Sequence, residues 1–151
     1  MGDRPTNSRD HPAGQTNMGI VIDTSLWIDH FRPSTPRAVK DQVLMYLNQK
    51  DVFIAEPILF ELLSNCPRRE RSRLESYFAL VPLLPTPPRL WREAAQLGQQ
   101  CKDAGLNVPA MDILIASLCI HHGVELATFD SHFSDIGQIA PLKAVCLARA
   151  A

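Results

Sequence analysis

The chain has 151 residues, 46% of them hydrophobic, and its 15 Lys and Arg residues nearly balance its 16 Asp and Glu residues, giving a formal net charge of −1. This length and composition fit one globular domain, and they exclude collagen-like, coiled-coil and mostly disordered proteins. Because the net charge is close to zero, no global basic field indicates a polyanionic partner.

The first residues differ in composition from the rest of the chain. Residues 1–17 contain only Met1 and Ala13 as hydrophobic residues, too few to offset the entropy of ordering the segment. We therefore expect a disordered extension or tag over 1–17 and one domain over 18–151. The segment also lacks the apolar stretch of a signal peptide, and the longest nearly apolar run, 113–120, is too short to cross a bilayer. We expect a cytoplasmic protein.

From residue 19 onward, short apolar runs alternate with longer stretches in which apolar residues have helical spacing. The run 20–22 ends on Asp23, and Thr24 or Ser25 is predicted to cap a helix that stops before Pro33. The later predicted elements are, in chain order, helix 35–47, strand 51–55, helix 57–63, helix 67–78, strand 81–84, helix 90–104, helix 109–122, strand 125–129 and strand 142–147. This alternation predicts a three-layer α/β fold, in which helices flank a central, mostly parallel sheet of about five strands.

Four acidic residues are predicted to lie at one edge of this sheet, where ligands bind in folds of this class. Asp23 and Asp130 directly follow strands, whereas Glu61 borders an apolar helix stripe and Asp112 lies in the first turn of a helix. Each has an ordinary structural explanation when it is taken alone. Asp23 and Asp130 would cap helices, and Glu61 would pair with an arginine. For Asp112 the ordinary explanation is a favourable interaction with the helix dipole in the first turn. This explanation is weaker, because Asp112 shares a face with Ile115 and the rest of the apolar stripe that docks on the sheet.

Convergence of these four carboxylates would have a chemical consequence. Several carboxylates at one place repel one another strongly unless protons or cations compensate their charge. Oxygen ligands alone suit Mg²⁺ or Mn²⁺, and Mg²⁺ sites usually combine a few carboxylates with water and substrate phosphate. The pattern therefore predicts metal-assisted attack of water on a phosphodiester bond.

The acids lie in four segments that follow one another in a fixed order. The segments read Val-Ile-Asp23-Thr-Ser-Leu-Trp-Ile, Glu61-Leu-Leu, Pro-Ala-Met-Asp112-Ile-Leu-Ile-Ala and Ala-Thr-Phe-Asp130-Ser-His-Phe. From about residue 19 to the carboxyl end, the chain resembles a PIN domain and, more narrowly, the VapC toxins of bacterial type II toxin–antitoxin modules. This resemblance implies a Mg²⁺-dependent endoribonuclease, with Mn²⁺ as a substitute ion, that forms a homodimer and is held inactive by a small VapB-type antitoxin.

The resemblance also implies roles for the acidic residues. Asp23 and Asp112 match the acids that hold the metal most directly, and Glu61 matches the helical acid that completes the cluster, directly or through water. Asp130 matches the fourth acidic position, whose metal contact is often indirect. Many relatives carry a further acid two residues later, where this chain has His132, although a histidine at that place is also common.

Thr24 and Ser25 match the small hydroxyl residues that follow the first acid in the family and orient water. Ser25 also bears on a different class of enzyme, because a haloacid-dehalogenase-type site needs a second Asp at that position and a receiver domain needs adjacent acids after the first strand. Both classes are disfavoured for this reason. The alternative that stays open is a PIN-like module that binds RNA or protein without catalysis.

Overall fold

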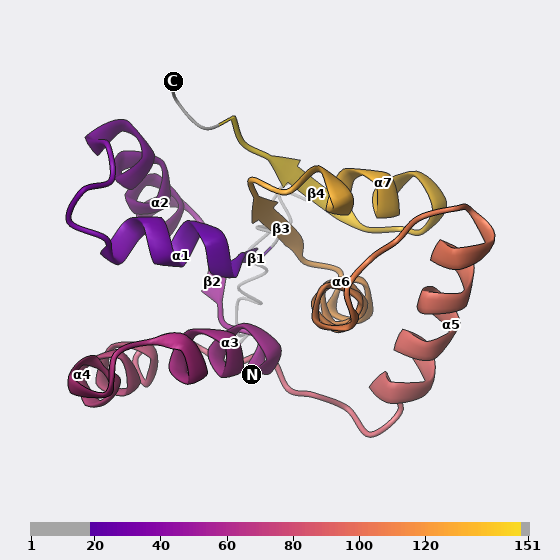
Figure 1. Cartoon of the computed structure of the whole chain (residues 1–151), viewed down its shortest axis with the longest axis horizontal. Helices are drawn as coiled ribbons and strands as arrows, with labels where there is room; N and C mark the ends of the chain where they lie inside the picture. Colours follow the sequence, from indigo (N-terminus) through magenta and orange to yellow (C-terminus); the bar gives the residue numbers. More distant parts are fainter. Residues whose placement is uncertain (1–18, 149–151) are drawn as a thin grey trace, which may run out of the picture.

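The computed structural model describes residues 19–148, so the prediction of disorder for 1–17 lies outside the described residues. A four-stranded sheet lies at the centre of this part of the chain (Figure 1), and every neighbouring pair of strands is parallel. The strands are β1 (Ile20–Ile22), β2 (Val52–Phe53), β3 (Glu125–Thr128) and β4 (Lys143–Cys146), in the spatial order β2-β1-β3-β4. The predicted α/β class and parallel pairing are confirmed.

The third of the five predicted strands, 81–84, is reduced to a single parallel bridge between Ile54 and Leu83. The Ile54 N–H donates to the Pro82 carbonyl at 2.9 Å, and the Leu84 N–H donates to the Ile54 carbonyl at 2.9 Å. Proline has no N–H to donate, so Pro82 cannot extend the pairing toward Val52, and in the other direction the partner chain enters a helix at Glu56. The segment therefore lies beside β2 without forming a full strand.

Helices flank the sheet on both sides (Figure 1). In the described part of the chain they are α1 (Thr24–Phe31), α2 (Arg37–Gln49), α3 (Glu56–Asn65), α4 (Arg68–Phe78), α5 (Leu90–Asp103), α6 (Ala110–His122) and α7 (Ser131–Ile139). Most begin within a few residues of the predicted positions. Gly123, at φ 64°, ends α6 in the left-handed conformation that favours glycine.

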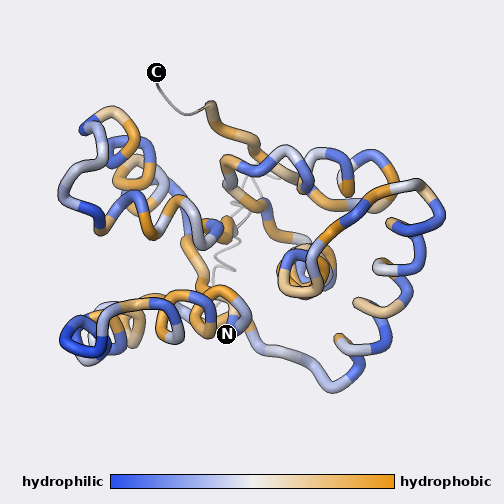
Figure 2. The backbone as a smooth tube through the Cα atoms, viewed as in Figure 1, coloured by the Kyte–Doolittle hydropathy of each residue, from blue (hydrophilic) through white to orange (hydrophobic). Residues whose placement is uncertain are grey.

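The core lies between the sheet and the helices that pack on it. All three residues of β1 are fully buried, as expected for a strand covered on both faces, and Ile115 and Leu118 of α6 are fully buried as well. Figure 2 shows the contrast between the hydrophobic strands and the strongly hydrophilic α4. On α1, Trp27 packs edge-on against Phe78 of α4, with ring centroids 5.0 Å apart. No helix among the described residues combines the length and apolar character that a membrane span requires.

Candidate metal centre

Asp23 lies where β1 ends and α1 begins, and it caps the helix. Its carboxylate accepts hydrogen bonds from the Thr24 N–H at 2.8 Å, the Thr128 hydroxyl at 2.8 Å and the Ser25 hydroxyl at 3.4 Å. The residue is only 6% exposed. Burial raises the pKa of the Asp23 carboxyl above its ordinary value, while these hydrogen bonds act in the opposite direction and the charge of Asp130 raises it again. Asp23 is thus a rigidly held, mostly desolvated acid.

Thr128, the last residue of β3, connects the two acids that follow strands. Its hydroxyl donates to Asp23 Oδ2 and accepts the Asp130 N–H at 2.9 Å, and the whole residue is buried. A hydroxyl has one proton and two lone pairs, so a single side chain satisfies both partners. No motif in the sequence pointed to Thr128. The available signal was a threonine two residues before Asp130, at the end of a strand next to the one that delivers Asp23.

Thr24 connects Asp23 to the acid on α3. While its N–H donates to Asp23, its hydroxyl donates to Glu61 Oε1 at 3.2 Å. Partial burial raises the pKa of Glu61, the hydrogen bond from Thr24 lowers it, and the charge of Asp23 raises it further. In the described part of the chain, Glu61 makes no ion pair with an arginine. The ordinary structural explanation for a carboxylate in this helix stripe therefore does not apply.

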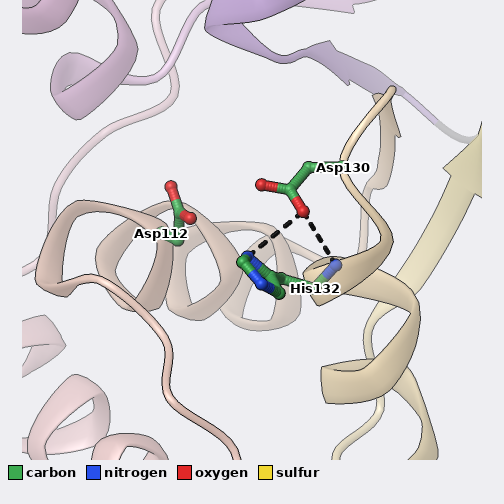
Figure 3. A group of neighbouring side chains, drawn as sticks. All are labelled: Asp112, Asp130 and His132. Carbon is green, nitrogen blue, oxygen red and sulfur yellow. Dashed lines mark hydrogen bonds and ion pairs between the residues drawn. The ribbon is translucent and has the colours of Figure 1, made fainter.

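Asp112, Asp130 and His132 form the tightest group of candidate ligands among the described residues (Figure 3). Each offers one ligand atom, and these atoms all lie within 4.8 Å of one another. Asp112 lies in the first turn of α6, and Asp130 caps α7. Asp130 Oδ1 accepts the His132 N–H at 2.9 Å and lies 3.2 Å from the His132 Nδ1. Two helix starts and one strand end therefore deliver the group.

The electrostatics of Asp112 connect this group to the remaining acids. Burial raises the pKa of Asp112 to about 6, and the charges of Asp23, Asp130 and Glu61 contribute to the rise, whereas His132 lowers it. Asp23 and Glu61 lie outside the tightest group, yet their charges act on the same carboxyl. The charges of the other three predicted acids therefore all act on the carboxyl of Asp112 and disfavour its ionised form.

The donor set is chemically suited to a divalent cation. Around an octahedral ion with ligands at about 2.1 Å, neighbouring ligand atoms lie about 3 Å apart and opposite ones about 4.2 Å apart. The ligand atoms of the tightest group lie within 4.8 Å of one another, which is close to the larger of these spacings. A cation there would offset the repulsion that raises the pKa of Asp112. The carboxylate oxygens of this group suit Mg²⁺ or Mn²⁺, and the group contains no thiolate.

Comparison with known proteins gives a consistent picture. The family described as PIN domain matches residues 20–139. The chain is 32% identical over 129 residues to the VapC ribonuclease Mb1587 of Mycobacterium bovis and to ribonuclease VapC11 of Mycobacterium tuberculosis, covering 83% of this chain and 96% of each relative.

Solved structures agree at the level of the fold. The chain matches VapBC2 from Rickettsia felis bound to a promoter DNA fragment with a TM-score of 0.70 and 18% identity, covering 86% of this chain and 99% of that one. It matches VapBC-5 from Mycobacterium tuberculosis with a TM-score of 0.61 and 20% identity, again covering 86% and 99% of the two chains.

Proposed function

We propose that this chain, which belongs to the PIN-domain family and within it to the VapC ribonucleases, cleaves RNA with a divalent cation held by Asp23, Glu61, Asp112 and Asp130. The observation that supports this proposal best is the electrostatic state of Asp112, whose pKa is raised to about 6 by burial and by the other three acids. Such repulsion is unfavourable for the fold alone, and it is useful at a site that binds a cation.

Each residue has a distinct part in this proposal. When bound, Mg²⁺, or Mn²⁺ as its substitute, stabilises the charge on the attacked phosphate and activates water for the attack. Asp112 and Asp130 present oxygens to the cation from two helix starts. Asp23 presents an oxygen from the end of β1, fixed by its three hydrogen bonds. Thr24 holds Glu61 toward the same place.

A cleavage assay tests the activity. Total RNA is incubated with the protein in Mg²⁺, in Mn²⁺ and in EDTA, beside the Asp112→Asn variant. We expect discrete fragments that require the metal and are absent with the variant. If the folded Asp112→Asn variant cleaves RNA like the parent, the assignment is wrong. If the folded parent binds RNA and cuts none with any metal, the non-catalytic binding module becomes the better interpretation.

We also propose that a VapB-type antitoxin holds the protein inactive in the cytoplasm, as the VapBC complexes among the structural relatives suggest. A groove of about 500 Å³ is lined by the apolar side chains of Ile28, Phe31 and Leu74, among others. Its charged lining residues are Arg32, Glu61 and Glu70. A peptide segment in this groove would lie next to Glu61. We expect a co-expressed VapB-type antitoxin to copurify with the chain and to suppress its cleavage of RNA.

The proposed homodimer has a candidate surface on the described part of the chain. Phe60 of α3 and Trp91 of α5 are 63% and 65% exposed, which is unusual for such large apolar side chains. Together with Pro57, Met111 and Leu114, they line one shallow pocket of about 260 Å³. A second copy would cover these rings, and Met111 is the sequence neighbour of Asp112, so such a dimer would form close to the metal centre.

A further inference from the structure

His132 lies against the metal-binding acids although it is not itself an acid. Its backbone N–H and its ring Nδ1 both approach Asp130 Oδ1, at 2.9 Å and 3.2 Å, so the imidazole ring is held at the side of this carboxylate. A ring nitrogen also lies within 4.8 Å of an Asp112 oxygen (Figure 3). The His132 side chain is 48% exposed, so it is free of the packing that would prevent a small rotation toward a cation.

A carboxylate beside a histidine is a common arrangement at metal sites. A metal-bound histidine usually has its other ring nitrogen held by a carboxylate or carbonyl, which fixes the orientation of the ring. The contact between Asp130 and His132 has this form. The same imidazole ring also lies within 4.8 Å of an Asp112 oxygen, so it borders both carboxylates.

We propose that His132 is a ligand of the bound cation and that its nitrogen makes this site select Mn²⁺ over Mg²⁺. The inference rests on the proposed function, because it concerns the ion that the four acids hold. Mg²⁺ is a hard cation that is bound almost entirely by oxygen, whereas imidazole nitrogen is a good ligand for transition metals. One nitrogen among the carboxylates therefore adds affinity for Mn²⁺ and little for Mg²⁺.

The test measures the ligand directly, on the metal-free full-length protein loaded with Mn²⁺. Electron spin echo envelope modulation detects a ¹⁴N nucleus bound to Mn²⁺. We expect this modulation in the parent, its loss in His132→Asn, and its persistence in His122→Asn, a control at the far end of α6 where the imidazole contacts the Pro85 carbonyl. Circular dichroism confirms that each variant is folded.

Calorimetric titrations with Mn²⁺ and with Mg²⁺ give the second readout. We expect His132→Asn to lose about tenfold in Mn²⁺ affinity, the scale on which even indirect metal partners act, with little change for Mg²⁺. His132→Asp, which restores an all-oxygen donor set, should lack the ¹⁴N signal and shift the preference back toward Mg²⁺. This variant keeps the test decisive if His132→Asn does not fold.

The outcomes separate this inference from the proposed function. Mn²⁺ that binds the parent without ¹⁴N modulation, or modulation that survives in both His132 variants, would overturn the role of His132 and leave the four acids as the site. Failure of the parent to bind either ion would overturn the proposed metal centre together with the inference.

Discussion

The hydroxyl of Thr128 donates to Asp23 Oδ2 at 2.8 Å, joining two residues that are 105 positions apart in the chain. The same hydroxyl accepts the N–H of Asp130, and Asp23 itself donates its N–H to the carbonyl of Ala127 at 2.9 Å. The ends of β1 and β3 are therefore locked together at the place where their two acids emerge. The buried Thr128 side chain therefore helps the strand pairing to fix the separation between Asp23 and Asp130.

Replacement of Thr128 by valine tests this relationship, because valine keeps the branched shape and removes the hydroxyl. The change leaves Asp23 Oδ2 and the Asp130 N–H without their partner. We expect a loss of about 1–3 kcal/mol in the free energy of unfolding, the usual cost of unpaired buried polar groups, together with weaker metal binding. Thr128→Ser keeps the hydroxyl and should restore metal affinity. Urea unfolding and Mn²⁺ titration measure the two effects, and equal metal affinity in the Val and Ser variants would refute the positioning role.

Removal of the Asp112 charge should stabilise the metal-free protein in a pH-dependent way. The folded-state pKa of Asp112 is about 6, whereas an unfolded Asp titrates near pH 4. Between these values the folded state binds more protons than the unfolded state, so the stability contributed by this group is present below about pH 4 and lost as the pH rises through 6. Asp112→Asn should therefore raise the unfolding temperature in EDTA at pH 7 and have little effect at pH 4.

The control for this prediction is Asp51→Asn, since Asp51 is an exposed acid in the loop before β2. It should leave the unfolding temperature nearly unchanged at both pH values. A pH-independent effect of Asp112→Asn, or destabilisation at pH 7 in EDTA, would show that Asp112 is not held among repelling charges.

Mg²⁺ should stabilise the parent more than it stabilises the Asp112→Asn variant. A ligand that binds only the folded state, at 100 times its dissociation constant, adds about 2.7 kcal/mol of stability. We expect a rise in the unfolding temperature of the parent on addition of Mg²⁺ at pH 7, reversed by EDTA. The Asp112→Asn variant, although more stable than the parent in EDTA, should show a smaller rise in unfolding temperature on addition of Mg²⁺. An equal gain in both proteins would place the binding of Mg²⁺ elsewhere.

Introduction of a charge at Trp91 should disrupt the proposed dimer. Trp91→Glu places a carboxylate on the exposed apolar surface of Phe60, Met111 and Leu114, where burial against a second copy would be costly. We expect the mass measured by light scattering to fall from dimer to monomer. Leu80→Glu is the matched control, because Leu80 is 85% exposed and does not line this pocket. A mass unaffected by Trp91→Glu would remove this surface from consideration.

Local sequence patterns predicted much of the fold, because the position of a single strand or helix depends largely on residues that are close together in the chain. The uninterrupted apolar run 20–22 forms the fully buried β1, and the helix predicted over 109–122 is observed as Ala110–His122. The strand predicted over 81–84 is reduced to one bridge, because the pattern of apolar residues gave no weight to the missing N–H of Pro82. A segment that favours extended backbone still needs free N–H groups to form the hydrogen bonds that pair it with a neighbouring strand.

The candidate site was predictable to a different extent. The spacing of apolar residues predicts the strands and helices that carry the four acids. The parallel topology predicts that these acids lie at the same edge of the sheet. The role of Thr128 depends on the pairing of β1 with β3, which no local pattern specifies. The contact of His132 with Asp130 depends on how α7 begins, with Asp130 as its cap and the histidine two residues later. That contact is local, because the two residues are two positions apart, and only the approach of the pair to Asp112 requires the fold.

A crystal structure of the Mn²⁺-loaded protein, with anomalous diffraction used to locate the ion, tests the central claim most directly. We predict an anomalous peak among Asp23, Glu61, Asp112 and Asp130, within about 2.2 Å of at least one oxygen of Asp112. The peak should be absent from crystals of Asp112→Asn grown and soaked in the same way. An ion bound at another place in the fold, or no ion at this place at a saturating Mn²⁺ concentration, would contradict the account of these four acids as one metal centre.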